Sequence, residues 1–156
     1  MLNLADNMVL LDQGRVAAAG PLEDLMNRCD LQRLTGADDP GTVIVTTLDA
    51  HQDGLTRLGF PGGMLWVPKV AAPAGNRQRV RIGARSVAIA LQKPPGTSIQ
   101  NIFPGKVTAI SDGPGGLLDV QMDIGCPLLA RITWRAMQTL ALTPGKPIYA
   151  LVKSVA

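Results

Sequence analysis

Short apolar stretches, separated by turns rich in glycine and proline, recur along most of the chain. Residues 55–60 alternate between apolar and polar positions, which is typical of a strand with one buried face. Such runs return about every ten residues, and this spacing is typical of a small all-β barrel or sandwich. Strands are predicted at residues 8–11, 15–19, 43–48, 55–60, 64–68, 80–91, 107–110, 117–122, 128–133 and 150–155.

Two segments depart from the strand pattern. Residues 134–142 place apolar side chains at helical spacing and end before Pro144, which predicts one short helix capping a barrel. Residues 22–26 follow Pro21 and carry acidic side chains in the first predicted helical turn, where the helix dipole favours them. The two strands before Pro21 flank the turn Asp12-Gln13-Gly14, so we expect a β-hairpin followed by a helix.

Two linker-like stretches divide the chain. The first, residues 34–40, is polar and rich in turn-forming residues, and the second contains the consecutive prolines Pro94 and Pro95. We therefore expect an N-terminal segment, a linker and two small subdomains. Their predicted bounds are residues 1–33, 34–40, 41–92 and 93–156.

The two predicted subdomains have similar plans. Beyond residue 106 the order of strand, turn, strand, turn and strand matches the order that starts at residue 43. Arg85-Ser86-Val87 also resembles Lys153-Ser154-Val155 in its distance from a preceding glycine, with two extra residues in the first copy. These similarities indicate an internal duplication. Gly83-Ala84 interrupts the alternation of residues 80–91, and we expect a β-bulge there.

Charge and aromatic content argue against several classes of protein. The net charge is +3, from 15 basic and 12 acidic residues, and aromatic residues make up 3% of the chain, so we expect no nucleic-acid partner. The odd spacing of the local basic cluster predicts a solvated outer face of one strand. No apolar run is long enough to span a membrane and no signal peptide is evident, so we expect a cytoplasmic protein without membrane insertion. The cluster consists of Arg77, Arg79, Arg81 and Arg85.

Motifs for catalysis and metal binding are absent from the sequence. The nucleotide-binding pattern G-x-x-x-x-G-K-[ST] does not occur, and we expect a chain that neither binds nor hydrolyses ATP. Cys29 and Cys126 lie far apart without a C-x-x-C partner, and His51 has no second ligand nearby, so we predict no disulfide and no metal site. We also expect no catalytic residue and no covalent cofactor.

Two polar stretches carry the candidate chemistry. The turn before residue 102 offers a hydroxyl, an amide and main-chain N–H groups, and the last strand ends in an ammonium beside a hydroxyl. Several donors that point inward together can replace the hydration of a small anion, and charge-assisted hydrogen bonds are the strongest of them. The predicted oxyanion-binding residues are Ser98, Ile99, Gln100, Asn101, Lys153 and Ser154.

These motifs, with a Leu-Thr-Pro-Gly-Lys turn between them, resemble the TOBE/Mop domain of molbindins, which binds molybdate. The same module ends the ATP-binding subunit of bacterial molybdate ABC transporters, and the resemblance covers residues 93–156. Residues 1–33, with Leu-Ala-Asp, Val-Leu-Leu, Gly-Arg-Val and Gly-Pro-Leu-Glu-Asp-Leu in order, are similar to the closing segment of an ABC nucleotide-binding domain.

The resemblance implies two small OB-like barrels that exchange strands in a homodimer. The Ser98 turn of one chain would meet Lys153 of its partner, with molybdate or tungstate between them. Such a domain would sense cytoplasmic molybdate in an importer, whose membrane permease is then a further partner. The full-length subunit would be a molybdate-transporting ATPase, of which this chain would be a truncated form or a fragment.

Two other functions remain open. One is a molybdate store of the molbindin type, although a store has no use for residues 1–33. The other is a structural dimerisation module without a working anion site. Its support is Gln100, which stands where the Mop family commonly has an arginine that helps to hold the anion.

Overall fold

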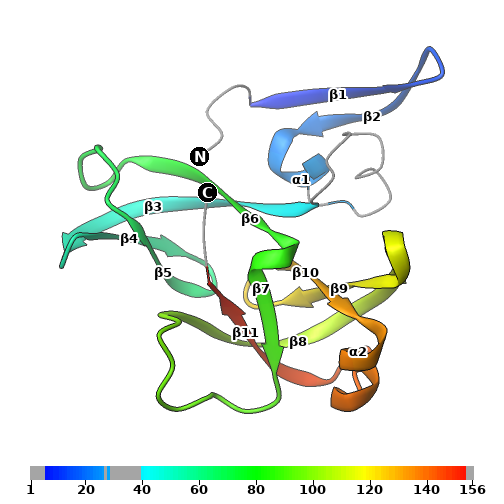
Figure 1. Ribbon diagram of the computed structural model, residues 1–156. Helices are drawn as coiled ribbons and strands as arrows, with labels where there is room; N and C mark the ends of the chain where they lie inside the picture. Colours follow the sequence, from blue (N-terminus) through cyan, green and yellow to red (C-terminus); the bar gives the residue numbers. More distant parts are fainter. Residues whose placement is uncertain (1–5, 27, 29–39, 154–156) are drawn as a thin grey trace.

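The computed structural model describes residues 6–26, 28 and 40–153 (Figure 1). Strands predominate among these residues, and the predicted N-terminal hairpin, its helix and the short helix near the C-terminus are all present. The all-β prediction is confirmed. The elements are β1 (Asn7–Asp12), β2 (Arg15–Pro21), α1 (Leu22–Met26), β3 (Gly41–Gln52), β4 (Leu55–Phe60), β5 (Gly63–Pro68), β6 (Arg77–Gly83), β7 (Val87–Ala90), β8 (Asn101–Asp112), β9 (Leu117–Asp123), β10 (Pro127–Thr133), α2 (Trp134–Leu140) and β11 (Pro147–Val152), with 3-10 turns at Ala84–Ser86 and Pro114–Gly116.

The strands form a hairpin and two larger antiparallel sheets. The four-stranded sheet has the order β5-β4-β3-β6, and the five-stranded sheet has the order β10-β9-β8-β11-β7. The first four strands of the larger sheet repeat the order of the smaller one, and both β3 and β8 span 12 residues and contain a register shift. This repeated topology agrees with an internal duplication. The predicted subdomain bounds stay a prediction, and β7, which precedes residue 93, is the edge strand of the five-stranded sheet.

The predicted continuous strand at residues 80–91 is wrong. The chain leaves the four-stranded sheet at Gly83, makes a 3-10 turn, and enters the other sheet at Val87. Ala84, in this turn, is fully buried and donates its N–H to the carbonyl of Pro40 at 2.7 Å. The expected bulge is therefore a crossing between sheets. Arg85 lies in the turn and does not share a strand with Arg77.

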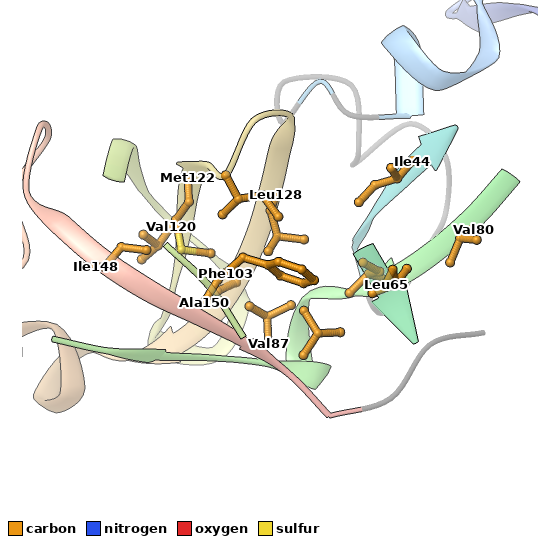
Figure 2. Close-up of a cluster of buried hydrophobic side chains, with 14 of the residues drawn as sticks. Ile44, Leu65, Val80, Val87, Phe103, Val120, Met122, Leu128, Ile148 and Ala150 are labelled. Atoms are coloured by element: carbon orange, nitrogen blue, oxygen red, sulfur yellow. The ribbon is translucent and has the colours of Figure 1, made fainter. Parts of the chain in front are cut away.

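The two sheets share one apolar core (Figure 2). The Phe103 ring extends from β8 toward Leu65 of β5 and packs edge-on against Phe60 of β4, with ring centroids 5.1 Å apart. Each buried side chain of this size contributes roughly 1.5–3 kcal/mol relative to exposure. The fully buried members include Leu48, Leu58, Leu65, Val80, Ile82, Val107, Val120, Met122, Leu128, Ala130, Ile148, Ala150 and Val152.

Corresponding turns of the two sheets also meet. The β4–β5 turn contains Gly62 and the β9–β10 turn contains Gly125, and a Cβ at Gly125 would lie 2.5 Å from the Cα of Gly62. A Cβ at Gly62 would collide with the carbonyl oxygen of Ile124. Glycine therefore permits two main chains to approach more closely than any side chain would allow.

The N-terminal hairpin has a small core of its own. Leu10 and Leu25 are buried against each other, and Leu22 donates its N–H to the carbonyl of Asp6 at 3.0 Å. The Asp6 carboxylate reaches Arg79 of β6 at 2.6 Å. The hydrogen bond from Arg79 and the attraction of its charge lower the pKa of Asp6 below its ordinary value. Because Asp6 is fully exposed, water screens this ion pair and its contribution to stability is small.

Substituting Gly62→Ala should destabilise the protein by about 1–3 kcal/mol, because the new methyl group forces the two touching turns apart. Thermal unfolding monitored by circular dichroism measures the effect. Gly59→Ala is the matched control in the same hairpin, since its Cβ would meet Thr47 O at 3.7 Å and Met64 Sδ at 3.8 Å, both ordinary contacts. Equal melting temperatures for the two variants would contradict the close approach.

Candidate functional site

Three chain segments converge at one end of the five-stranded sheet. Val152, the last residue of β11, lies opposite Asn101 at the start of β8 and opposite Val87 at the start of β7. Lys153 follows directly and donates its N–H to the carbonyl of Ser86 at 3.0 Å. The start of β8 and the tip of β11 are adjacent in Figure 1. The two polar stretches singled out from the sequence therefore lie side by side within one chain.

The predicted site residues differ in their exposure. The side chains of Ser98, Gln100 and Lys153 are exposed, and Ile99 is half-buried. Asn101 is only 6% exposed. Solvent can therefore reach a hydroxyl, an amide and an ammonium at this end of the sheet. Ser154 lies outside the described residues.

Two of the predicted donors are already engaged. The N–H of Ile99 donates to Thr97 Oγ1 at 3.1 Å, which closes the turn on itself. The side chain of Asn101 accepts a hydrogen bond from Trp66 N–H and donates one to the Trp66 carbonyl, both at 2.8 Å. The Asn101 amide therefore bonds to β5 of the other sheet.

The charge at this end of the sheet is positive. Residues 84–86, 97–101 and 150–153 contain no Asp or Glu, and they carry Arg85 and Lys153. Sequence reasoning did not place Arg85 and the half-buried Ser86 in the site. The signal that could have found them is the similarity of Arg85-Ser86-Val87 to Lys153-Ser154-Val155.

Comparison with known protein families gives a match in the C-terminal part of the chain. Residues 97–156 match the TOBE domain family. These residues are therefore similar to a TOBE domain. The match begins at Thr97, the first residue of the polar turn, and runs through the strand that ends beside Lys153.

The similarity to curated proteins extends over almost the whole chain. It is 43% identical over 155 residues to the molybdenum import ATP-binding protein ModC of Mesorhizobium japonicum, covering 97% of this chain and 42% of that protein. The ModC of Albidiferax ferrireducens is 44% identical, with 98% of this chain and 42% of that protein covered. The chain thus spans less than half the length of these relatives. It is similar to their C-terminal part.

A solved structure supports the fold. The cytoplasmic molybdate-binding protein ModG, crystallised with molybdate bound, superposes with a TM-score of 0.66 at 22% sequence identity. The superposition covers 74% of this chain and 93% of the ModG chain. This likeness confirms the predicted all-β, OB-like architecture.

A hollow of about 480 Å³ lies away from the strand ends, between α1, β3 and the β9–β10 turn. Its one thiol, Cys126, is half-buried, and this burial, together with the negative charge of Asp123, raises the pKa of Cys126 to about 11. The thiol is neutral at pH 7 and is a poor nucleophile. The other lining residues are Asp24, Arg28, Val43, Ile44, Val45, Pro61, Gln121 and Pro127.

A second hollow, of about 360 Å³, lies between β7 and α2 beside the five-stranded sheet. Arg131 lines it, and this guanidinium bonds to both carboxylate oxygens of Asp119, at 2.7 and 2.9 Å. The carboxylate balances the charge of the arginine, so this hollow attracts an anion less than the end of the sheet does. Its remaining walls are mostly apolar.

His51 has a structural role. Its Nε2 donates to the carbonyl of Ala72 at 3.0 Å, because that oxygen can only accept, and its Nδ1 lies 2.9 Å from Thr56 Oγ1. His51 is exposed, and its ring joins β3 to the loop after β5. In residues 6–26, 28 and 40–153, no group of three or more His, Cys, Asp or Glu side chains is placed to hold a metal ion. No helix in the same residues is long and apolar enough to cross a membrane.

The raised pKa of Cys126 predicts slow alkylation. Moving the pKa from 9.0 to about 11 lowers the thiolate fraction at pH 8 by about 100-fold, and the thiolate is the reacting species. In a Cys29→Ser background, iodoacetamide labelling followed by mass spectrometry should be slow for the folded protein. It should reach the rate of an ordinary cysteine in denaturant. Equal rates in both states would contradict the burial of this thiol.

Proposed function

We propose that this chain is the regulatory oxyanion-binding region of the ATP-binding subunit of a bacterial molybdate importer. The observation that carries the proposal is the convergence of the turn at residues 97–101 with Lys153 at one end of the five-stranded sheet, where the three converging segments contain Arg85 and Lys153 and no Asp or Glu. The similarity to molybdenum import proteins and the shared fold with a molybdate-binding protein support molybdate as the ligand. Tungstate has the same charge and shape and is the alternative ligand.

The donors match what a tetrahedral dianion requires. Lys153 supplies a positive charge, the Ser98 hydroxyl and the Gln100 side-chain amide supply neutral donors, and Ser154 supplies a second hydroxyl. Gln100 stands where the Mop family commonly has a charged arginine. Its neutral amide can still donate a hydrogen bond to the anion, but without the charge the affinity for the anion is lower. The N–H of Ile99 joins the site when the anion displaces the Thr97 hydroxyl. Selectivity over sulfate then depends on the size of the pocket.

Regulation follows from pairing of two chains. In a homodimer that pairs through this end of the sheet, the anion held by the Ser98 turn and Lys153 of one chain also contacts the partner chain, and binding then stabilises the pair by mass action. Anion binding and the arrangement of the paired ATP-binding subunits are thereby coupled. On this proposal the subunits lie at the cytoplasmic face of the membrane beside the permease, and molybdate arrests import when the cell is supplied. The chain regulates ATP hydrolysis and does not perform it.

Lys153→Ala should weaken molybdate binding by about 10- to 100-fold, because a charged hydrogen bond contributes about 1.5–3 kcal/mol. Isothermal titration calorimetry with molybdate, tungstate and sulfate measures the effect. Lys106→Ala is the matched control, since Lys106 is equally exposed and lies at the opposite end of the same β8–β11 pair, across from Pro147. Lys106→Ala should leave the affinity unchanged.

The alternative is a structural dimerisation module without a working anion site, which Gln100 favours. It predicts no heat and no change in melting temperature with wild-type protein at millimolar molybdate, while sedimentation still detects a dimer. That result would reject the regulatory proposal. A dimer whose association tightens with molybdate would support the proposal against the structural alternative.

A further inference from the structure

The edge strand β5 is joined to the candidate anion site by one side chain. Because β5 lies at the edge of the four-stranded sheet, main-chain groups on its outer side pair with no strand in the described part of the chain. For Trp66 the Asn101 amide supplies both partners, accepting from the N–H and donating to the carbonyl at 2.8 Å each. The amide thus takes the place of a neighbouring strand at this residue.

Asn101 is also the residue that leads out of the anion-binding turn. It follows the exposed Gln100 directly, and it lies opposite Val152, which precedes Lys153. Phe103, two residues further along the same face of β8, packs against Phe60 of β4. The start of β8 is therefore held to the other sheet by a polar clamp and an aromatic contact. A shift of this strand would move donors on both sides of the anion site.

We propose that Asn101 is a positioning residue for the anion site and not a ligand. This inference rests on the proposed function and assigns a different role to one of its predicted ligands. With its amide engaged by Trp66, Asn101 holds the Ser98–Gln100 turn and Lys153 at a set separation before the anion arrives. Preorganised donors do not have to be ordered on binding, so affinity depends on the docking of β8 against β5.

The duplicated topology provides a matched control. Thr42, near the start of β3, accepts a hydrogen bond from the N–H of Leu129 in β10 at 2.9 Å. β3 and β10 hold the places in their sheets that correspond to β8 and β5. Thr42 is 2% exposed and its bond is buried, and Asn101 is itself only 6% exposed. Thr42→Val removes a bond between the two sheets without touching the turn at residues 97–101.

The first experiment needs no ligand. Hydrogen–deuterium exchange with mass spectrometry compares wild type, Asn101→Ala and Thr42→Val. Asn101→Ala should accelerate exchange in residues 97–101 and around Trp66 by at least about tenfold, because the clamp no longer closes this region. Thr42→Val should accelerate exchange near Leu129 and leave residues 97–101 unchanged. If Asn101→Ala does not fold, Asn101→Leu serves, since it keeps the approximate size and branching of the side chain, loses both bonds to Trp66 and adds no charge next to the anion site.

The second experiment is a molybdate titration of the same variants by calorimetry. Asn101→Ala should bind about tenfold more weakly or worse, whereas Thr42→Val should keep wild-type affinity even where it lowers the melting temperature. The inference would be overturned if Asn101→Ala exchanged at the wild-type rate at residues 97–101, or if Thr42→Val accelerated exchange there equally. An unchanged molybdate affinity in Asn101→Ala would also overturn it. Absence of molybdate binding by wild type would instead reject the proposed function, and the exchange experiment would still decide whether the clamp positions the turn.

Discussion

The apolar core shared by the two sheets is the constraint on which the other features depend. Aromatic residues make up 3% of the chain, so the core consists mostly of aliphatic side chains that interlock from both sheets. Because both sheets cover the same core, strand ends that would otherwise be solvated become buried. Polar groups at those ends then require partners inside the protein, and Asn101 and Thr42 provide them.

The candidate anion site lies at the rim of this core. Within one residue the chain passes from the exposed Gln100 to Asn101, which is 6% exposed, and Lys153 likewise follows the fully buried Val152. Donors in such a position are accessible to an ion and are attached directly to buried residues of the packed core. This arrangement suits a sensor, because an event at the surface acts directly on the packing between the sheets.

The residues covered by the TOBE match are fewer than those that build this end of the five-stranded sheet. The TOBE match covers residues 97–156, but the strand next to β11 is β7, which lies outside that range. Trp66, the partner of Asn101, also lies outside it. The end of the five-stranded sheet that carries the proposed site is therefore built partly with residues that precede the TOBE match. The similarity to molybdenum import proteins along almost the whole chain agrees with a joint unit.

Local pattern in the sequence predicted most of the strands, the N-terminal hairpin and both helices, because alternation and helical spacing report burial within a short segment. It missed the ends of several strands, since β8 begins at Asn101 and β11 at Pro147. Motif spacing also picked out the two stretches that meet at Lys153. Only tertiary structure decided that the chain changes sheets at Ala84, since alternation does not reveal which core buries a residue. An Asn side-chain amide could also bind an anion, but in the folded chain the Asn101 amide is hydrogen-bonded to Trp66, 35 positions away in the sequence. The partners of a buried polar group depend on non-local packing, which sequence periodicity does not record.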